Sequence, residues 1–238
     1  KIALEHLTPV VLLTDAFIAN GSAAWRLPDI EALPEIRPHR VTPDQQFKYS
    51  PYRRDPETLV RYWAVPGQEG YTHILGGLEK DGETGAISTD PDNHHHMDTL
   101  RAEKVARIPV PDLQVEGDAD DADLLIVGFG STYGHLHAAM TALRRQGHKV
   151  ALAQMKYINP LPANTAEVLL RYKKVVVAEQ NLGQLAALLR IRINGFAPYQ
   201  LNRVYGQPFR VDKLVAIFAD IISGKTKADG ATFASWMI

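Results

Sequence analysis

The second half of the chain alternates short apolar runs with segments in which apolar residues recur every three or four positions. The run Leu-Leu-Ile-Val at 124–127 has the length and composition of a strand buried on both faces. After it, apolar side chains fall at i, i+3, i+4 and i+7, the stripe of an amphipathic helix. These side chains are Leu136, Ala139, Met140 and Leu143. The later elements predicted in the same way are strand 150–153, a helix opened by Asn164, strand 175–178, helix 184–193, a strand near 200–204 and helix 211–222.

This alternation of strands and helices predicts the fold class. Strands that each lead into a helix pair in parallel, and the helices cover both faces of the sheet. Gly147 is placed to end the first helix, and Asn164 with Glu167 three residues on has the spacing of a capping box. The sequence therefore predicts an α/β domain with a mostly parallel open sheet over residues 122–224, followed by a tail at 225–238.

The first half of the chain has a different pattern. Residues 1–22 combine a short helix end, an apolar strand at 9–14 and a turn of small residues. Because the apolar run is typical of a central parallel strand and a single strand is not stable alone, we expect the chain to be the C-terminal part of a longer polypeptide. Residues 23–121 are interrupted by prolines and predict a long connector, with one helix near 93–107 and an acidic, solvated hinge at 118–123.

Composition narrows the class of protein. The formal net charge of −1 gives no electrostatic reason to expect binding to nucleic acid or to an anionic membrane. The sequence contains no cysteine, which excludes disulfides, thiolate metal sites and a cysteine nucleophile in this chain. No apolar run is long enough to cross a bilayer, and no signal peptide is evident. We therefore expect a cytoplasmic protein.

Three polar motifs have plain structural interpretations. Gly128 and Gly130 lie at a strand-to-helix turn, but the third glycine of a dinucleotide fingerprint would fall on Tyr133, so a tight turn is favoured and only anion binding at the helix N-terminus stays open. The consecutive histidines 94–96 point in different directions on a helix and predict a contact with a neighbouring subunit rather than a metal site. The loop 179–184 follows a strand, where it either contacts a ligand or satisfies backbone groups.

The stretch 46–85 is the first place to look for ligand contacts. It is long and irregular, yet it is rich in aromatic residues, which are rare in disordered segments. A guanidinium matches a carboxylate or phosphate bidentately, and adjacent aromatic rings exclude water from such a pair. The arginines could equally form surface ion pairs with the acidic residues 55 and 57. The three arginines of this stretch are Arg53, Arg54 and Arg61.

Several separated motifs together resemble one family. In chain order they are TPVVLLTDAFIANGS at 8–22, Arg61 with Val65-Pro66-Gly67, Gly76-Gly77-Leu78-Glu79, Asn93-His94 and EQNLGQL at 179–185. They are similar to the alpha subunits of the thiamine diphosphate-dependent 2-oxoacid:ferredoxin oxidoreductases, in particular those acting on 2-oxoglutarate, over nearly the whole chain. The resemblance implies that 1–22 ends a pyrimidine-binding domain and that 122–224 is a domain like the C-terminal domain of transketolase.

The resemblance also implies an activity. It is the oxidative decarboxylation of 2-oxoglutarate to succinyl-coenzyme A, with electrons passed to ferredoxin. The family's partner beta subunit holds thiamine diphosphate, Mg²⁺ and a [4Fe–4S] cluster, and the implied assembly is a dimer of alpha–beta units. The missing N-terminal part of the alpha subunit would carry the glutamate that activates the cofactor, so no catalytic residue is expected in this chain.

The family's substrate-binding residues match two positions here. An arginine shortly before a Pro-Gly and a later threonine hold the distal carboxylate in relatives, and Arg61 and Thr72 are the matching residues. Arg61 lies somewhat further from its Pro-Gly than in many relatives, so Arg53 and Arg54 stay rivals for the role. The alternatives are a pyruvate-type member of the family, the C-terminal domain of another thiamine enzyme such as a transketolase or a 2-oxoacid dehydrogenase, or an interaction module without turnover of its own.

Overall fold

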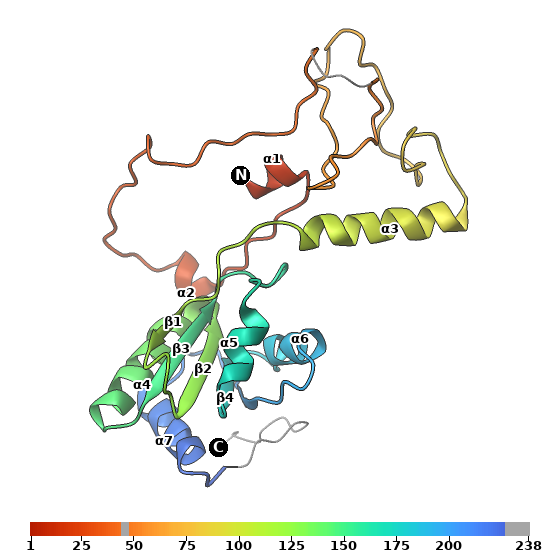
Figure 1. Cartoon of the computed structure of the whole chain (residues 1–238). Coiled ribbons are helices and arrows are strands. Elements are labelled where there is room, and N and C mark those ends of the chain that lie inside the picture. Colours follow the sequence, from red (N-terminus) through yellow and green to blue (C-terminus); the bar gives the residue numbers. More distant parts are fainter. Residues whose placement is uncertain (44–47, 227–238) are drawn as a thin grey trace. The chain divides into compact units, whose positions relative to one another are not determined.

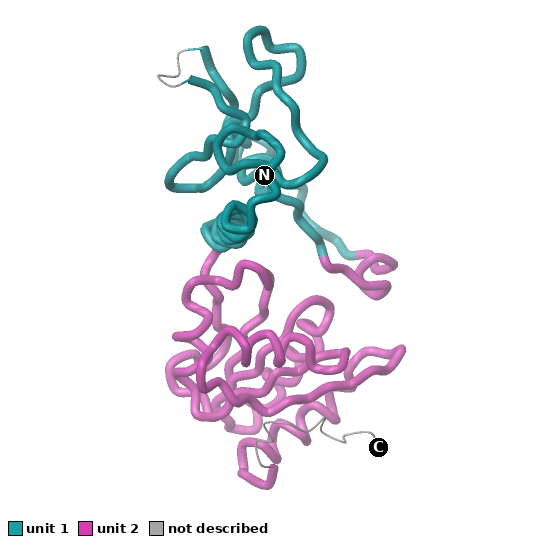
Figure 2. The backbone as a smooth tube through the Cα atoms, turned by 90° about the vertical axis from the view of Figure 1, so that its right-hand side faces the viewer, with its two compact units in different colours: residues 1–12, 23–109 teal, residues 13–22, 110–238 magenta. Residues whose placement is uncertain are grey.

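The computed structural model describes residues 1–43 and 48–226. It divides into two compact units, which Figure 2 colours separately. The first unit comprises residues 1–12 and 23–109, and the second comprises residues 13–22 and 110 onward. The part of the predicted tail beyond residue 226 lies outside the described residues.

The second unit is built on one five-stranded sheet. Its strand order is β1-β3-β2-β4-β5, with β1 antiparallel to β3 and every other neighbouring pair parallel. This arrangement confirms the mostly parallel open sheet that the sequence predicts. The strands are β1 (Val115–Gly117), β2 (Leu124–Phe129), β3 (Val150–Met155), β4 (Val175–Glu179) and β5 (Tyr199–Asn202).

Helices cover both faces of this sheet (Figure 1). Side chains of the central strand β2 point alternately to the two faces, so Leu124 and Ile126 join one core while Leu125 and Val127 join the other. The first core is closed by α4 (Tyr133–Arg145) and α7 (Val211–Ile222), and the second by α5 (Thr165–Arg171) and α6 (Gln184–Arg192). The described part of this unit also contains α2 (Ala16–Ala19) and the 3₁₀ turn η1 (Gly130–Thr132).

The sequence predicts the elements of this unit closely, with two errors. The buried residues of α4 are the four of the predicted stripe, and Gly147 adopts a left-handed φ of 92° just after that helix. Asn164 does precede α5, but its side chain makes no capping hydrogen bond. It pairs instead with the backbone N–H and C=O of Leu113, at 2.8 and 3.1 Å, so the predicted capping box is wrong. The edge strand β1 is not predicted, because three residues carry too little pattern.

The predicted strand at 9–14 is also wrong for this chain. Residues 8–15 have no regular structure, and the apolar side chains of Val11 and Leu12 are 78% and 86% exposed. A strand forms only where another strand accepts its backbone hydrogen bonds, and among the described residues this run makes no β-bridge. The short helix α1 (Ile2–His6) precedes it.

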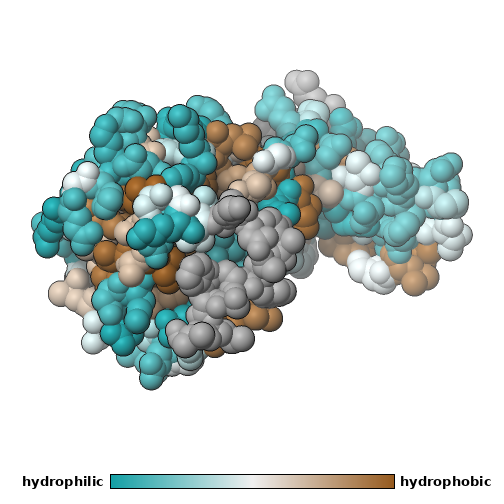
Figure 3. Space-filling view, turned by 90° about the horizontal axis from the view of Figure 1, so that it is seen from below, coloured by the Kyte–Doolittle hydropathy of each residue, from teal (hydrophilic) through white to brown (hydrophobic). Residues whose placement is uncertain are grey.

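Exposed large apolar side chains continue over residues 17–36, where Trp25, Leu27 and Ile30 are 75%, 86% and 80% exposed, and beyond that segment they are dispersed. On the face seen in Figure 3, hydrophobic residues lie in small separate groups among hydrophilic ones. Scattered apolar residues of this kind are normal on a protein surface. Among the described residues, no helix is long and apolar enough to span a membrane.

The first unit has little regular structure in its described part. Its long helix is α3 (Pro91–Ala106), which confirms the one helix expected in the connector. The remainder is irregular chain held by side chains that hydrogen-bond to backbone groups. Two short turns are examples of such hydrogen bonding. Asp55 accepts from the N–H and hydroxyl groups of Thr58, and Asp81 accepts from the same groups of Thr84.

Glu179 is the buried charge of the second unit, and it joins β4 to α6. Its side chain is fully buried, and the carboxylate accepts from the backbone N–H groups of Leu185 at 2.7 Å and Ala186 at 2.9 Å. These donors belong to the first turn of α6, where backbone N–H groups have no partner within the helix. A carboxylate there also interacts favourably with the helix dipole. The loop 179–184 thus satisfies backbone groups in this structure.

We predict that Glu179→Ala lowers the free energy of unfolding by at least about 2 kcal/mol, because it leaves two buried donors unpaired. Glu179→Gln keeps one acceptor oxygen and should cost less. Urea denaturation followed by circular dichroism measures both. The control is Glu167→Ala, an exposed glutamate on α5, which should leave the midpoint unchanged. Equal midpoints for Glu179→Ala and the control would refute the anchoring role.

Candidate functional site

A hairpin in the first unit brings two of the three predicted arginines together. Arg54 and Arg61 face each other across an antiparallel β-bridge. In such a pair, the side chains of directly opposed residues lie on the same side of the ribbon, about 5 Å apart at Cβ. The turn between them is closed by the Asp55 N–H, which donates to the Val60 carbonyl at 2.8 Å. The bridge therefore places the Arg54 and Arg61 side chains on the same side of the hairpin.

Asp55 shapes this turn, and among the described residues it forms no ion pair with Arg54 or Arg61. Its carboxylate accepts from the N–H and the hydroxyl of Thr58, each at 2.8 Å, and from the N–H of Glu57 at 3.1 Å. Burial acts to raise the pKa of Asp55, but the hydrogen bonds from Thr58 and Glu57 outweigh it and hold that pKa below its usual value. Among the described residues, neither Arg54 nor Arg61 forms a salt bridge with a carboxylate.

The two guanidinium groups have few acceptors around them. Arg54 donates from Nη1 to the Leu59 carbonyl at 2.9 Å, while its Nε is buried without a hydrogen-bond partner. Burial, with the nearby charges of Arg61 and Arg101, lowers the pKa of Arg54. Arg61 is half-buried, and its guanidinium lies over the ring of Tyr52, 4.8 Å from the centroid. The unpaired Nε–H of Arg54 is a buried donor that can form a hydrogen bond with an anion.

Helix α3 adds further cations to the same region. Arg101, Lys104 and Arg107 follow one another at three-residue intervals, so they share one side of the helix. Arg107 donates to the carbonyls of Pro56 and Glu57, at 3.0 and 2.9 Å, and so ties the tip of the hairpin to the C-terminal end of α3.

Lys104 lies one turn before that tie. It is half-buried and donates from Nζ to the Leu7 carbonyl at 2.7 Å. Burial, and then the charges of Arg54 and Arg61, lower the pKa of Lys104 to about 8. The lysine is therefore close enough to both arginines for its protonation to respond to them.

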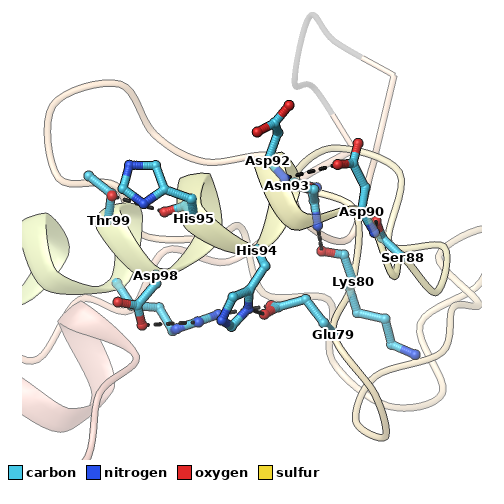
Figure 4. A network of polar contacts seen from close by, with 12 residues as sticks. Glu79, Lys80, Ser88, Asp90, Asp92, Asn93, His94, His95, Asp98 and Thr99 are labelled. Carbon is cyan, nitrogen blue, oxygen red and sulfur yellow. Dashed lines mark hydrogen bonds and ion pairs between the residues drawn. The ribbon is translucent and has the colours of Figure 1, made fainter.

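The start of α3 is held by the polar network in Figure 4. Asp90 caps the helix by accepting from the Asp92 N–H at 2.9 Å. The Asn93 amide group pairs with the Lys80 carbonyl at 3.0 Å and with the Gly82 N–H at 3.1 Å, which fixes the chain before the helix against its first turn.

Glu79 completes this network by neutralising one of the helix cations. It pairs with His94 at 2.6 Å and with Arg101 at 3.0 Å, and hydrogen bonds from both lower the pKa of Glu79. The charge of Arg101 is thus balanced within the first unit. His95 and His96 do not join His94 in a metal-binding group, and no cluster of three suitable ligands is present in the described ranges.

The remaining predicted residues lie apart from the pair. Arg53 precedes Arg54 in an extended segment, so its side chain points to the opposite side of the ribbon, where its charge acts on Tyr62. Thr72 is exposed in the loop that follows Gly70 and is not among the residues that the hairpin brings together. Lys104 was missed by sequence reasoning, although its spacing from Arg101 and from buried Met97 marks it as lying on the packed side of α3.

The glycine turn after β2 has a packing role. A Cβ atom at Gly128 would lie 2.3 Å from Leu136 Cδ1 and 2.9 Å from Thr132 Oγ1, so glycine permits α4 to approach the strand. The Gln154 amide donates to the Gly130 carbonyl at 3.0 Å. This packing agrees with the interpretation of the motif as a tight turn.

Comparison with known proteins identifies the class of the second unit and the relatives of the chain. A family model described as pyruvate:ferredoxin oxidoreductase core domain II matches residues 122–209. The 2-oxoglutarate oxidoreductase subunit KorA of Mycobacterium tuberculosis is 50% identical over 94% of this chain and 34% of its own length. The 2-oxoacid:ferredoxin oxidoreductase 2 subunit alpha of Aeropyrum pernix is 30% identical over 87% of this chain and 33% of its own.

A solved structure gives the same relationship. A 2-oxoglutarate:ferredoxin oxidoreductase from Magnetococcus marinus, with 2-oxoglutarate, coenzyme A and succinyl-CoA bound, has a TM-score of 0.73 and 31% identity, covering 82% of this chain and 34% of that chain. The chain is related by sequence and fold to the alpha subunits of the 2-oxoacid:ferredoxin oxidoreductases, which confirms the family resemblance. It spans about a third of the length of the Mycobacterium tuberculosis relative and of the two Aeropyrum pernix relatives.

We predict that Asp55→Ala opens the arginine hairpin. The N–H groups of Glu57 and Thr58 lose their acceptor, so their exchange with deuterated solvent should accelerate by about tenfold for each 1.4 kcal/mol lost. The turn at Asp81 is an internal reference, since Thr84 makes the same bonds to it. Asp81→Ala should accelerate the exchange of Thr84 and leave Thr58 unchanged. Unaltered exchange at Thr58 in Asp55→Ala would contradict this role of Asp55.

The same turn should weaken in acid. The pKa of Asp55 is lowered in the folded chain, so the stability it contributes is complete above the usual carboxyl pKa and is lost as the pH falls through the folded value. Below that value the protonated carboxyl is a poorer acceptor. Exchange at Thr58, corrected for its intrinsic pH dependence, should therefore accelerate on acidification in the native chain, while Asp55→Asn should abolish this pH dependence.

Proposed function

We propose that this chain is part of the alpha subunit of a 2-oxoglutarate:ferredoxin oxidoreductase, and that Arg61 with Arg54 binds the distal carboxylate of the substrate. The observation that carries the proposal is the pairing of two half-buried guanidinium groups without a carboxylate partner among the described residues. The relative that is half identical to this chain is named as a 2-oxoglutarate oxidoreductase subunit. The Magnetococcus marinus structure carries 2-oxoglutarate in its description.

The chemistry of the arginine pair suits a dicarboxylic 2-oxoacid. A planar guanidinium donates two parallel hydrogen bonds to a carboxylate. A second guanidinium nearby compensates the cost of removing that carboxylate from water. A substrate without the distal carboxylate, such as pyruvate, would leave both cations unpaired. Loss of one partner of a buried charge pair costs about 2–5 kcal/mol, which corresponds to roughly 30- to several-thousand-fold discrimination. Arg53 and Thr72 stay secondary candidates in this proposal.

The cofactors of the reaction would be held elsewhere. Thiamine diphosphate supplies the carbanion equivalent that permits decarboxylation, and coenzyme A accepts the succinyl group. An iron–sulfur cluster needs thiolate ligands, and this chain has no cysteine, so its residues do not fit that group. We therefore assign the [4Fe–4S] cluster, thiamine diphosphate and Mg²⁺ mainly to a partner beta subunit. The proposed assembly is a dimer of alpha–beta units that reduces ferredoxin in the cytoplasm.

A second candidate function is an oxidoreductase for a monocarboxylic 2-oxoacid. Ketoisovalerate oxidoreductase subunit VorA of Pyrococcus abyssi is 28% identical over 70% of this chain. Such a substrate has an apolar distal end, which would gain nothing from paired guanidinium groups. The arginine hairpin favours 2-oxoglutarate over this alternative.

We predict that Arg61→Met in the assembled enzyme raises KM for 2-oxoglutarate by at least about 30-fold. The same variant should alter kcat/KM for 2-oxobutyrate, a monocarboxylate, by less than about threefold. Thiamine-dependent reduction of viologen dye measures both substrates. The control is Arg26→Met, an exposed arginine outside the hairpin. Unchanged kinetics with 2-oxoglutarate would remove Arg61 from the substrate site.

A further inference from the structure

Of the three basic residues Arg101, Lys104 and Arg107 on the same side of α3, one has no assigned task. Arg101 is balanced by Glu79, and Arg107 is committed to backbone carbonyls at the hairpin tip. Lys104 lies between them on α3, and in the described part of the chain it forms no salt bridge. Its acceptor among the described residues is the carbonyl of Leu7, which is uncharged. The ammonium group is therefore half-buried without a counter-charge.

The surroundings of Lys104 make this arrangement unfavourable in the absence of an anion. The charged groups that act on Lys104 are Arg54 and Arg61 from the hairpin, and the charge of Lys104 in turn acts on His6 from the N-terminal segment. Burial lowers the pKa of His6, and its Nδ1 is buried without a hydrogen-bond partner. Like charges brought together in a desolvated region repel one another. An anion placed among them would relieve that repulsion.

We propose that Lys104 is a third anion-binding residue of this site, which contacts the distal carboxylate of a dicarboxylic 2-oxoacid together with Arg61 and Arg54. This inference rests on the proposed function. It makes the substrate site a three-cation arrangement contributed by two segments, the hairpin and α3, that lie more than forty residues apart in the sequence. Lys104 is then a specificity residue, since it interacts with the part of the substrate that does not react.

Because the pKa of Lys104 is lowered, the affinity for the dicarboxylate should depend on pH. With a pKa of about 8 in the free chain, the ammonium group loses its proton as the pH rises through that value. Binding a carboxylate favours the charged form and so takes up a proton. Affinity for the dicarboxylate should therefore be greatest below pH 8 and fall above it. His6 does not produce this change, because its pKa lies below the ordinary histidine value, far from pH 8.

The test uses the assembled enzyme with three variants. Lys104→Met removes the charge and keeps most of the side-chain volume, Lys104→Arg keeps a charge that does not titrate near pH 8, and Lys173→Met changes an exposed lysine on the second unit as the control. We expect Lys104→Met to raise KM for 2-oxoglutarate by about tenfold or more while leaving kcat/KM for 2-oxobutyrate within about threefold. The control should match the unmodified enzyme.

The dependence of KM on pH distinguishes two roles of Lys104: binding the substrate carboxylate, and holding the backbone at Leu7. In the unmodified enzyme, KM for 2-oxoglutarate should rise between pH 7.5 and 9, and Lys104→Arg should flatten that rise while retaining affinity at pH 7.5. Equal losses on both substrates in Lys104→Met would overturn the inference, and would indicate that Lys104 holds the backbone or a carboxylate of another protein segment. Unchanged KM values in Lys104→Met would overturn it as well.

Parallel measurements on Arg61→Met keep this inference distinct from the proposed function. If Arg61→Met raises KM for 2-oxoglutarate and Lys104→Met does not, the assignment of Lys104 fails alone. If neither variant affects 2-oxoglutarate, the arginine hairpin is not the substrate site and both fail. If both raise KM selectively for the dicarboxylate, both are supported.

Discussion

The first unit depends on one constraint: a hairpin that forces two arginines to face each other. The turn chemistry of Asp55 and Thr58 fixes the register, and that register leaves the guanidinium groups on one side. Side by side, like charges raise the free energy of the folded chain unless an anion or water screens them. Burial of the Arg54 Nε removes part of that screening. Such an arrangement is retained where a ligand compensates it, since polar groups left unsatisfied cluster at functional sites.

The two units are stabilised by different interactions. The second unit gains its stability from apolar side chains of a central sheet between helices, where Phe218 and Leu143 are fully buried. The first unit has few such residues and is fastened instead by side chains bonded to backbone, as in the ties made by Arg107 and Asn93. Hydrogen bonds of this kind are directional and individually modest. They fix the positions of charged groups without covering them, which suits a segment that must meet a polar ligand.

Sequence patterning predicted the second unit well because its elements carry strong local signals. The stripe of α4 and the bounds of α7 follow directly from helical periodicity, and the glycine after α4 marks its end. Local rules failed where tertiary contacts compete with them. Asn164 bonds to Leu113, some fifty residues earlier, instead of capping α5. The apolar run at 9–14 has the composition of a strand, yet pairing is a property of two segments and cannot be read from one.

The candidate site shows the same limit. Residue type and spacing were enough to select Arg61 and Arg54, but only the bridge between them distinguishes that pair from Arg53, which shares their chemistry and points the other way. The spacing of Lys104 marks only the packed side of α3, and its relevance to the site arises because that helix, which begins thirty residues after the hairpin, brings it near the arginines. The function of a charged side chain depends on the other charged groups near it. Among the described residues, Arg54, Arg61 and Lys104 have no carboxylate partner, and this missing negative charge is itself an indication of an anionic ligand; under the proposed function, a substrate with a second carboxylate supplies that charge where a monocarboxylate does not.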